Sequence, residues 1–227
     1  MNSWNEQMQL LSVELVPFFM ALVFHEYAHA AMANYWGDRT AQSQGRLTLN
    51  PLPHLDPIGS ILFPILGMLS GSSFLFAWAR PVPINEKYFR KLKPGIFWTA
   101  LAGPAMNWFL ALCSAVVFCL LEKWLPPTFF LHQPLILMAY ISVRLNYTLM
   151  IFNLIPLPPL DGSKVLEVFL PYAYRRQFEQ ISQYSFFIFL ALMMTGAFSI
   201  LQYPIRFFTE WTLILTTTLF GVSSSGV

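Results

Sequence analysis

Long apolar stretches separated by short polar breaks form the basic pattern of this chain. They lie at residues 10–36, 57–79, 96–121, 134–155, 183–203 and 204–222, and each is long enough to enter or cross a bilayer core of about 30 Å. The stretch at 96–121 contains no charged residue at all. The pattern predicts an all-α polytopic membrane protein, a bundle of about four to six membrane segments.

The composition supports a lipid environment. Hydrophobic residues make up 56% of the 227 residues, charged residues 11%, and the mean hydropathy is +0.54. Soluble domains carry about 25% charged residues, so the charges here could not cover a water-exposed surface. The net charge of +2 is scattered over loops and indicates no nucleic-acid partner. We expect a multi-pass integral protein of the bacterial inner membrane, with the lipid bilayer as its partner; the oligomeric state stays open.

The chain shows no repeat and no separate soluble part. Residues 1–227 are therefore expected to form one membrane-embedded domain, with a core at 10–170 and C-terminal membrane segments at 183–222. Residues 204–222 contain Arg206 and Glu210, and we expect them to lie in the interface or to cross only partly.

The positive charges predict the topology. Residues 80–95 and 164–176 form two basic loops, which are expected on the cytoplasmic side and are joined by two crossings. The N-terminal tail lacks Lys and Arg, so the first span should begin outside and end inside. Residues 57–79 therefore cannot be one full crossing, and we predict a re-entrant element. Residues 40–49 partly alternate between apolar and polar and predict short strands or a hairpin.

The first apolar stretch carries the motif His25-Glu26-Tyr27-Ala28-His29. Residues i and i+4 share one helix face, so both imidazoles can bind one metal ion. Glu26 lies beside the first ligand, where it can take the proton of a water molecule that the metal activates. The alternative is a chance match or two histidines bonded within a bundle. Ionisable groups inside the span of a chain with so few charges favour the metal site.

A catalytic zinc site has three protein ligands and one open position, so a third ligand must come from elsewhere. Asp161 follows a proline-rich segment at the end of a span, where its carboxylate can turn back toward a neighbouring helix. Its alternative role is the N-cap of a short helix at 163–170. The other candidates are His54, His132, Cys113, Cys119 and the remaining acids.

Three motifs follow one another along the chain: His25-Glu26-x-x-His29, Ala102-Gly103-Pro104-x-x-Asn107, and Asn153-Leu154-Ile155-Pro156-Leu157-Pro158-Pro159-Leu160-Asp161-Gly162. Together they resemble the site-2 protease family of intramembrane zinc metalloproteases. The stretch from Arg46 through Asn50-Pro51, His54, Asp56-Pro57 and Gly59, and the stretch Trp78-Ala79-Arg80-Pro81-Val82-Pro83, are similar to the compact branch without PDZ or CBS domains. The resemblance covers about residues 24–162.

The resemblance implies a role for each motif. His25, His29 and Asp161 would bind one zinc ion, and Glu26 would be the general base. Asn153 would bind the substrate backbone or the oxyanion of the tetrahedral intermediate, a strong catalytic device. The alternative role of Asn153 is a hydrogen bond between helices.

Three further polar residues are candidates for supporting roles or for substrate contacts. We expect Asn107 to bond between helices, and Asn146, seven residues before Asn153 on the same face, to support the site from behind its ligands. His54 is a loop histidine, a supporting residue or a fourth ligand that substrate displaces, and the first two roles are favoured.

The predicted reaction is hydrolysis of a peptide bond in a transmembrane protein or peptide. The substrate must extend locally because a regular helix hides its carbonyls, and residues 40–49 or 78–84 could offer a strand edge to it. The alternatives are a metal-binding membrane transporter or sensor and a non-proteolytic membrane scaffold. The sequence lacks a second metal-binding cluster for the former, and the intact Glu26 argues against the latter.

Overall fold

The computed structural model describes residues 3–62 and 79–222, and all regular elements in these two ranges are helical. The α-helices are α1 (Ser3–Trp36), α2 (Thr40–Ser43), α4 (Leu92–Trp124), α5 (His132–Asn153), α6 (Asp161–Phe169), α7 (Tyr172–Ser182), α8 (Ser185–Met194) and α9 (Gln202–Phe220). Short turns of other helix types are η1 (Leu52–His54), η2 (Pro57–Leu62), η3 (Glu86–Tyr88) and η4 (Ala197–Leu201). The predicted all-α class is confirmed.

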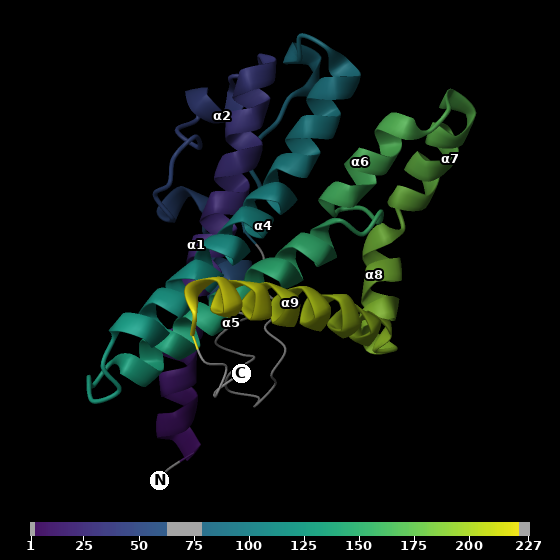
Figure 1. Cartoon of the computed structure of the whole chain (residues 1–227). Coiled ribbons are helices and arrows are strands. Elements are labelled where there is room, and N and C mark those ends of the chain that lie inside the picture. Colours follow the sequence, from purple (N-terminus) through teal and green to yellow (C-terminus); the bar gives the residue numbers. More distant parts are fainter. Residues whose placement is uncertain (1–2, 63–78, 223–227) are drawn as a thin grey trace.

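Three described helices are long and apolar enough to cross a membrane: Ser12–Trp36 of α1, α4 and α5. They coincide with the spans predicted at residues 10–36, 96–121 and 134–155. α1 and α4 run side by side, and α5 returns along α4 after a turn at the lower left of Figure 1. The N terminus lies near that same end, whereas α2 and α6 lie at the opposite end.

Small side chains form the contact between α4 and α5. The buried residues of this cluster include Ala111, Ala115, Cys119, Ala139 and Val143. Because lipid supplies no hydrophobic force between helices, small residues that let backbones approach are the usual way to hold such a pair together. Cys119 is buried and free, as expected for a packing residue.

Hydrogen bonds join the polar segments on either side of residues 57–79. The amide of Arg80 donates to the carbonyl of His54 over 2.9 Å, and the amide of Asn85 donates to Asp38 Oδ2 over 2.6 Å. Two segments in contact cannot be connected by a single crossing of about 30 Å. Both flanks of residues 57–79 thus lie together, as the predicted re-entrant element requires. Most of that element, residues 63–78, lies outside the described residues.

The prediction of short strands at residues 40–49 was wrong. Thr40–Ser43 forms α2, and the two described ranges contain no strand. The buried Asp38 carboxylate accepts hydrogen bonds from both the backbone N–H and the hydroxyl of Thr40, which turns the chain directly after α1. The segment after Ala79 is not a strand either, because Pro81 and Pro83 have no N–H for a ladder.

The apolar stretch at residues 183–203 was also predicted as one span, and this was wrong. α8 has 10 residues, about 15 Å of helix, which is half the thickness of the bilayer core. The helix stops before Gly196, whose φ of +69° is readily adopted by glycine. The chain then turns through η4 into α9.

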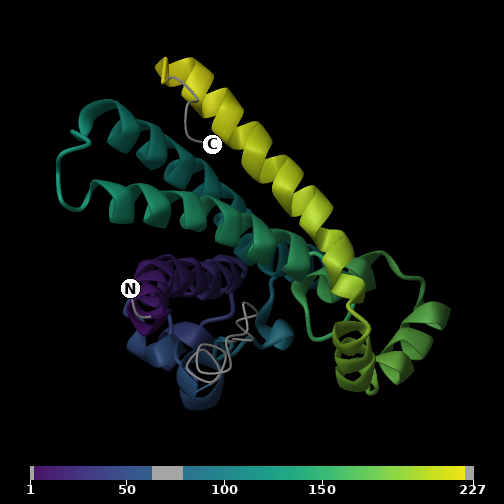
Figure 2. The same ribbon diagram turned by 90° about the horizontal axis from the view of Figure 1, so that it is seen from below.

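α9 lies across the hairpin of α4 and α5 (Figures 1 and 2). The hydroxyls of Tyr147 and Thr212 lie 2.6 Å apart, and Lys123 Nζ donates to the carbonyl of Phe220 over 2.8 Å. Arg206 and Glu210 form an exposed ion pair on its other side. α9 is not among the three described helices that are long and apolar enough to cross a membrane.

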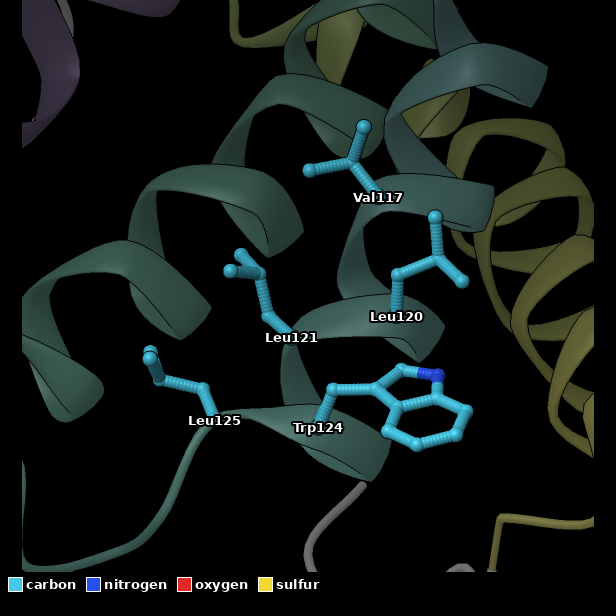
Figure 3. Close-up of a pocket in the computed structure, with 5 residues that line it drawn as sticks. All are labelled: Val117, Leu120, Leu121, Trp124 and Leu125. Carbon is cyan, nitrogen blue, oxygen red and sulfur yellow. The ribbon is translucent and has the colours of Figure 1, made fainter.

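An apolar groove lies at the far end of α4 (Figure 3). It is lined by Val117, Leu120, Leu121, Trp124 and Leu125. Leu121 follows Gly103 by 18 residues, about 27 Å along the helix. The groove is therefore remote from the Ala102-Gly103-Pro104 motif, and its apolar lining suits contact with the acyl chains of lipids.

Candidate metal site

His25 and His29 lie on one face of α1 and point at the same place. Their side chains are buried, and the two Nε2 atoms are 3.0 Å apart. The spacing of four residues in a helix produces this arrangement, as the sequence predicted.

The protonation of His25 is fixed by a chain of hydrogen bonds that ends on backbone carbonyls. The Asn146 amide donates to the carbonyl of Ser142 over 2.8 Å, so its Oδ1 accepts from Asn107 Nδ2 over 3.0 Å. Asn107 Nδ2 also donates to the carbonyl of Ala21, which leaves Asn107 Oδ1 as an acceptor 2.6 Å from His25 Nδ1. His25 Nδ1 must therefore carry a proton, and in the neutral ring Nε2 presents a lone pair.

The same reasoning applies to His29. Its Nδ1 lies 2.7 Å from the backbone carbonyl of Thr99, which can only accept. Nδ1 of His29 thus carries a proton, and in the neutral ring its Nε2 presents a lone pair. Both rings are held from behind in the orientation that metal-binding histidines require.

Asp161 is the first residue of α6 and joins the two histidines. Its Oδ2 lies 3.3 Å from both Nε2 atoms and makes no hydrogen bond within the described residues. The N-cap position belongs to Leu160, and no side-chain capping bond forms there, so the alternative role as a cap is wrong.

With both rings neutral, three acceptor atoms converge here: the two Nε2 atoms and Asp161 Oδ2. Two imidazole lone pairs and a carboxylate oxygen repel one another unless a cation lies among them. Ligand atoms around a tetrahedral zinc ion are roughly 3.3 Å apart, given bonds of about 2.0 to 2.1 Å. The separations of 3.0 to 3.3 Å fit such an ion, and two nitrogens with one carboxylate oxygen form a donor set that zinc favours.

Gly103 of α4 leaves the space that the cluster occupies. A Cβ atom at this position would lie 2.3 Å from His29 Nε2 and 2.7 Å from His25 Nε2. The small residue in the Ala102-Gly103-Pro104 motif therefore lets α4 pass directly beside the metal site.

Glu26 is buried next to the histidines and faces the segment after residue 79. Its Oε2 accepts a hydrogen bond from the backbone N–H of Val82 over 2.9 Å. In the described residues this bond occupies Oε2 and leaves Oε1 available to another partner.

Comparison with known proteins places this site in a family. The model of "Peptidase family M50" matches residues 128–196. The chain is 35% identical over 198 residues, 87% of each chain, to "Putative zinc metalloprotease YwhC" of Bacillus subtilis. The chain belongs to peptidase family M50. It is 29% identical to "Putative zinc metalloprotease Rip2" of Mycolicibacterium smegmatis over 79% of this chain and 66% of that one, and 30% identical to "Putative zinc metalloprotease MJ0611" of Methanocaldococcus jannaschii over 72% and 73%.

No solved structure matches this M50 peptidase. Family membership confirms the resemblance to site-2 proteases and makes the protein a membrane-embedded metalloprotease whose metal is zinc. His25, His29 and Asp161 are the only group of three or more His, Cys, Asp and Glu side chains within the described residues whose ligand atoms converge.

Two predicted site residues of the M50 peptidase, Asn153 and His54, bond to backbone carbonyls in the described part of the chain. Asn153 donates to the carbonyl of Leu149 over 3.0 Å, within its own helix. His54 is fully buried in the loop after α2, and its Nε2 lies 2.9 Å from the carbonyl of Thr48. Neither His54 nor His132 belongs to the converging group.

Two contacts of the site were missed by sequence reasoning. One is the backbone carbonyl of Thr99, and the other is the backbone N–H of Val82. Every residue type has the carbonyl, and every type except proline has the N–H. No residue pattern could single them out. Only the fold shows which backbone groups approach His29 and Glu26.

Proposed function

We propose that this M50 peptidase hydrolyses peptide bonds of membrane-spanning substrates at a zinc site formed by His25, His29 and Asp161. The observation that carries the proposal is the convergence of two imidazole Nε2 atoms and one carboxylate oxygen at separations that fit a tetrahedral zinc ion. When bound, zinc polarises the scissile carbonyl and lowers the pKa of the attacking water molecule. Proton transfer and the binding of the substrate are assigned to side chains of this protein.

Glu26 is the proposed general base. It takes a proton from the attacking water while the oxygen of that water bonds to the carbonyl carbon, and it returns the proton to the leaving nitrogen as the C–N bond breaks. Its free Oε1 can face the water because Oε2 is held by Val82. Its place beside His25 brings the carboxylate to the metal site without making it a ligand.

The proposed site lies at membrane depth. His29 precedes the end of α1 at Trp36 by seven residues, roughly 10 Å along the helix. A substrate peptide bond must therefore reach zinc inside the bilayer, near the end of the span where α2 and α6 lie. It must also be unwound, because a helical carbonyl is already bonded to its own chain.

Asn153 is proposed to donate to the oxyanion or to the substrate backbone. Its bond to Leu149 uses one of two N–H groups, and a rotation of the side chain would free both. Asn107 and Asn146 are proposed to support the site by orienting His25. His54 is proposed to stabilise its loop rather than to bind zinc.

Membership of the M50 family argues against the two alternatives, a metal transporter or sensor and a non-proteolytic scaffold. The location that we propose is a bacterial cell membrane, supported by the similarity to YwhC of Bacillus subtilis. The direct test is to measure zinc in detergent-purified protein and cleavage of a panel of tagged single-span membrane proteins. Zinc with cleavage supports the proposal, whereas zinc without cleavage of any panel member would contradict it.

A further inference from the structure

A proline-containing segment lies against Glu26. This proline strap, residues 80–83, contains Pro81 and Pro83, neither of which has an N–H. The N–H of Val82 is therefore the one backbone donor between the two prolines, and it donates to Glu26 Oε2 over 2.9 Å. The side chain of Val82 is buried in a cluster with Ala30 and Ala41, which fixes the strap against α1.

Arg46 holds the strap from the other side. One guanidinium nitrogen donates to the carbonyl of Arg80 over 2.6 Å and to the carbonyl of Pro81 over 3.2 Å. Arg46 itself is only 7% exposed. The carbonyl of Pro81 belongs to the same peptide plane as the amide of Val82, and the carbonyl of Arg80 belongs to the preceding one. Arg46 therefore sets the position of the peptide plane that binds Glu26.

Stabilisation of a loop does not by itself explain the burial of the Arg46 charge. Burial and the nearby charge of Arg80 lower the pKa of Arg46, and the carboxylate of Glu26 acts in the opposite direction. Its Nε makes no hydrogen bond within the described residues. Burying a charge that is satisfied by neutral carbonyls is unfavourable unless a nearby opposite charge compensates, and Glu26 supplies one.

We propose that Arg46 is a positioning residue for peptide hydrolysis, acting through the proline strap to fix the carboxylate of Glu26. The inference rests on the proposed function of Glu26 as the general base. A glutamate side chain has three rotatable bonds, and a hydrogen bond to one carboxylate oxygen selects the orientation in which the other meets the water. Arg46 contacts neither zinc ligands nor this water, so its effect should fall on turnover rather than on metal binding.

The test compares Arg46→Gln and Arg46→Lys with Arg39→Gln, which removes an exposed positive charge from the same loop region. The probe is the panel member that the wild type cuts fastest. We expect Arg46→Gln to lower kcat about 10- to 100-fold with unchanged KM and zinc content. Arg46→Lys should recover part of the loss because its ammonium can still donate to a carbonyl, and Arg39→Gln should match the wild type.

A second pair of variants tests the route through the strap. Val82→Pro removes the N–H that Glu26 accepts, whereas Val82→Ala keeps it and loses only packing. Val82→Pro should lower kcat as Arg46→Gln does, Val82→Ala should be affected less, and Arg46→Gln should add little to Val82→Pro. Independent, multiplicative losses would show that Arg46 does not act through this amide and would overturn the proposal.

The outcomes also separate this inference from the proposed function. If the wild type cuts no panel member, or if Glu26→Gln cuts as fast as the wild type, the proposed function fails. If the wild type is active, Glu26→Gln is inactive and Arg46→Gln equals Arg39→Gln, only the role of Arg46 fails. A loss of zinc in Arg46→Gln in parallel with activity would make Arg46 a structural residue and would equally overturn the proposal.

Discussion

Asn107 Oδ1 lies 2.6 Å from Nδ1 of His25 and directs the other ring nitrogen toward Asp161. Asn107 is fully buried, and its amide is held in this orientation by the carbonyl of Ala21 and by Asn146. The zinc affinity of the site should therefore depend on a residue that does not bind the metal.

Replacement of Asn107 tests this dependence. Asn107→Leu keeps the size of the side chain but removes the acceptor, and we expect zinc affinity to fall about 10- to 100-fold, as for other residues that orient a metal-binding histidine. Asn107→Asp keeps an acceptor and should lose less. The measurement is competition with a metal chelator, with Phe109→Leu on the exposed face of α4 as the control. Wild-type affinity in Asn107→Leu would rule out the orienting role.

Gly103 should tolerate no side chain. The Cβ of Gly103→Ala would lie 2.3 Å from His29 Nε2, so the histidines or α4 must move and zinc content should fall to a small fraction of the wild-type value. The exposed neighbour Ala105 provides a control, because Ala105→Val adds bulk to the outer face of the same helix. Elemental analysis of purified protein measures both. Full zinc occupancy in Gly103→Ala would show that the ion binds elsewhere.

Asp161 should be needed for zinc and not for capping α6. No capping bond depends on its side chain, so Asp161→Asn should fold but lose the anionic ligand. Zinc at 100 times its dissociation constant stabilises a folded protein by about 2.7 kcal/mol, so a chelator should lower the Tm of the wild type. The same chelator should leave the Tm of Asp161→Asn almost unchanged. Equal shifts in the two proteins would contradict the assignment.

The two histidines could be predicted from the four-residue spacing of a helix, and the three spans from the length of their apolar stretches. Asp161 could not be chosen on local chemistry, since a helix cap and a ligand have the same sequence position; the family resemblance decided it, and the structure shows Oδ2 without a hydrogen bond beside both rings. α2 replaced the predicted strands because the Asp38 carboxylate bonds Thr40, a contact that outweighs a weak alternation. The break at Gly196 was missed because a lone glycine in an apolar run leaves the hydropathy almost unchanged.

The topology can be tested by labelling. The flanks of residues 57–79 are hydrogen-bonded to each other, so single cysteines at Ser43 and Asn85 should react with an impermeant reagent from the same side. The background should lack Cys113 and Cys119, and a cysteine at the exposed Phe130, in the turn between α4 and α5, should label from the opposite side. Labelling of Ser43 and Asn85 from opposite sides would contradict the arrangement.

The central claim is that Glu26 moves the proton in peptide hydrolysis, and the most direct measurement is the turnover and zinc content of Glu26→Gln. The variant keeps the size of the side chain and an oxygen that can accept from Val82, so it should fold and bind zinc as the wild type does. Loss of a general base lowers turnover by about 100- to 10,000-fold. We predict full zinc occupancy with turnover reduced to that extent; cleavage of the same single-span substrate at the wild-type rate would contradict the account.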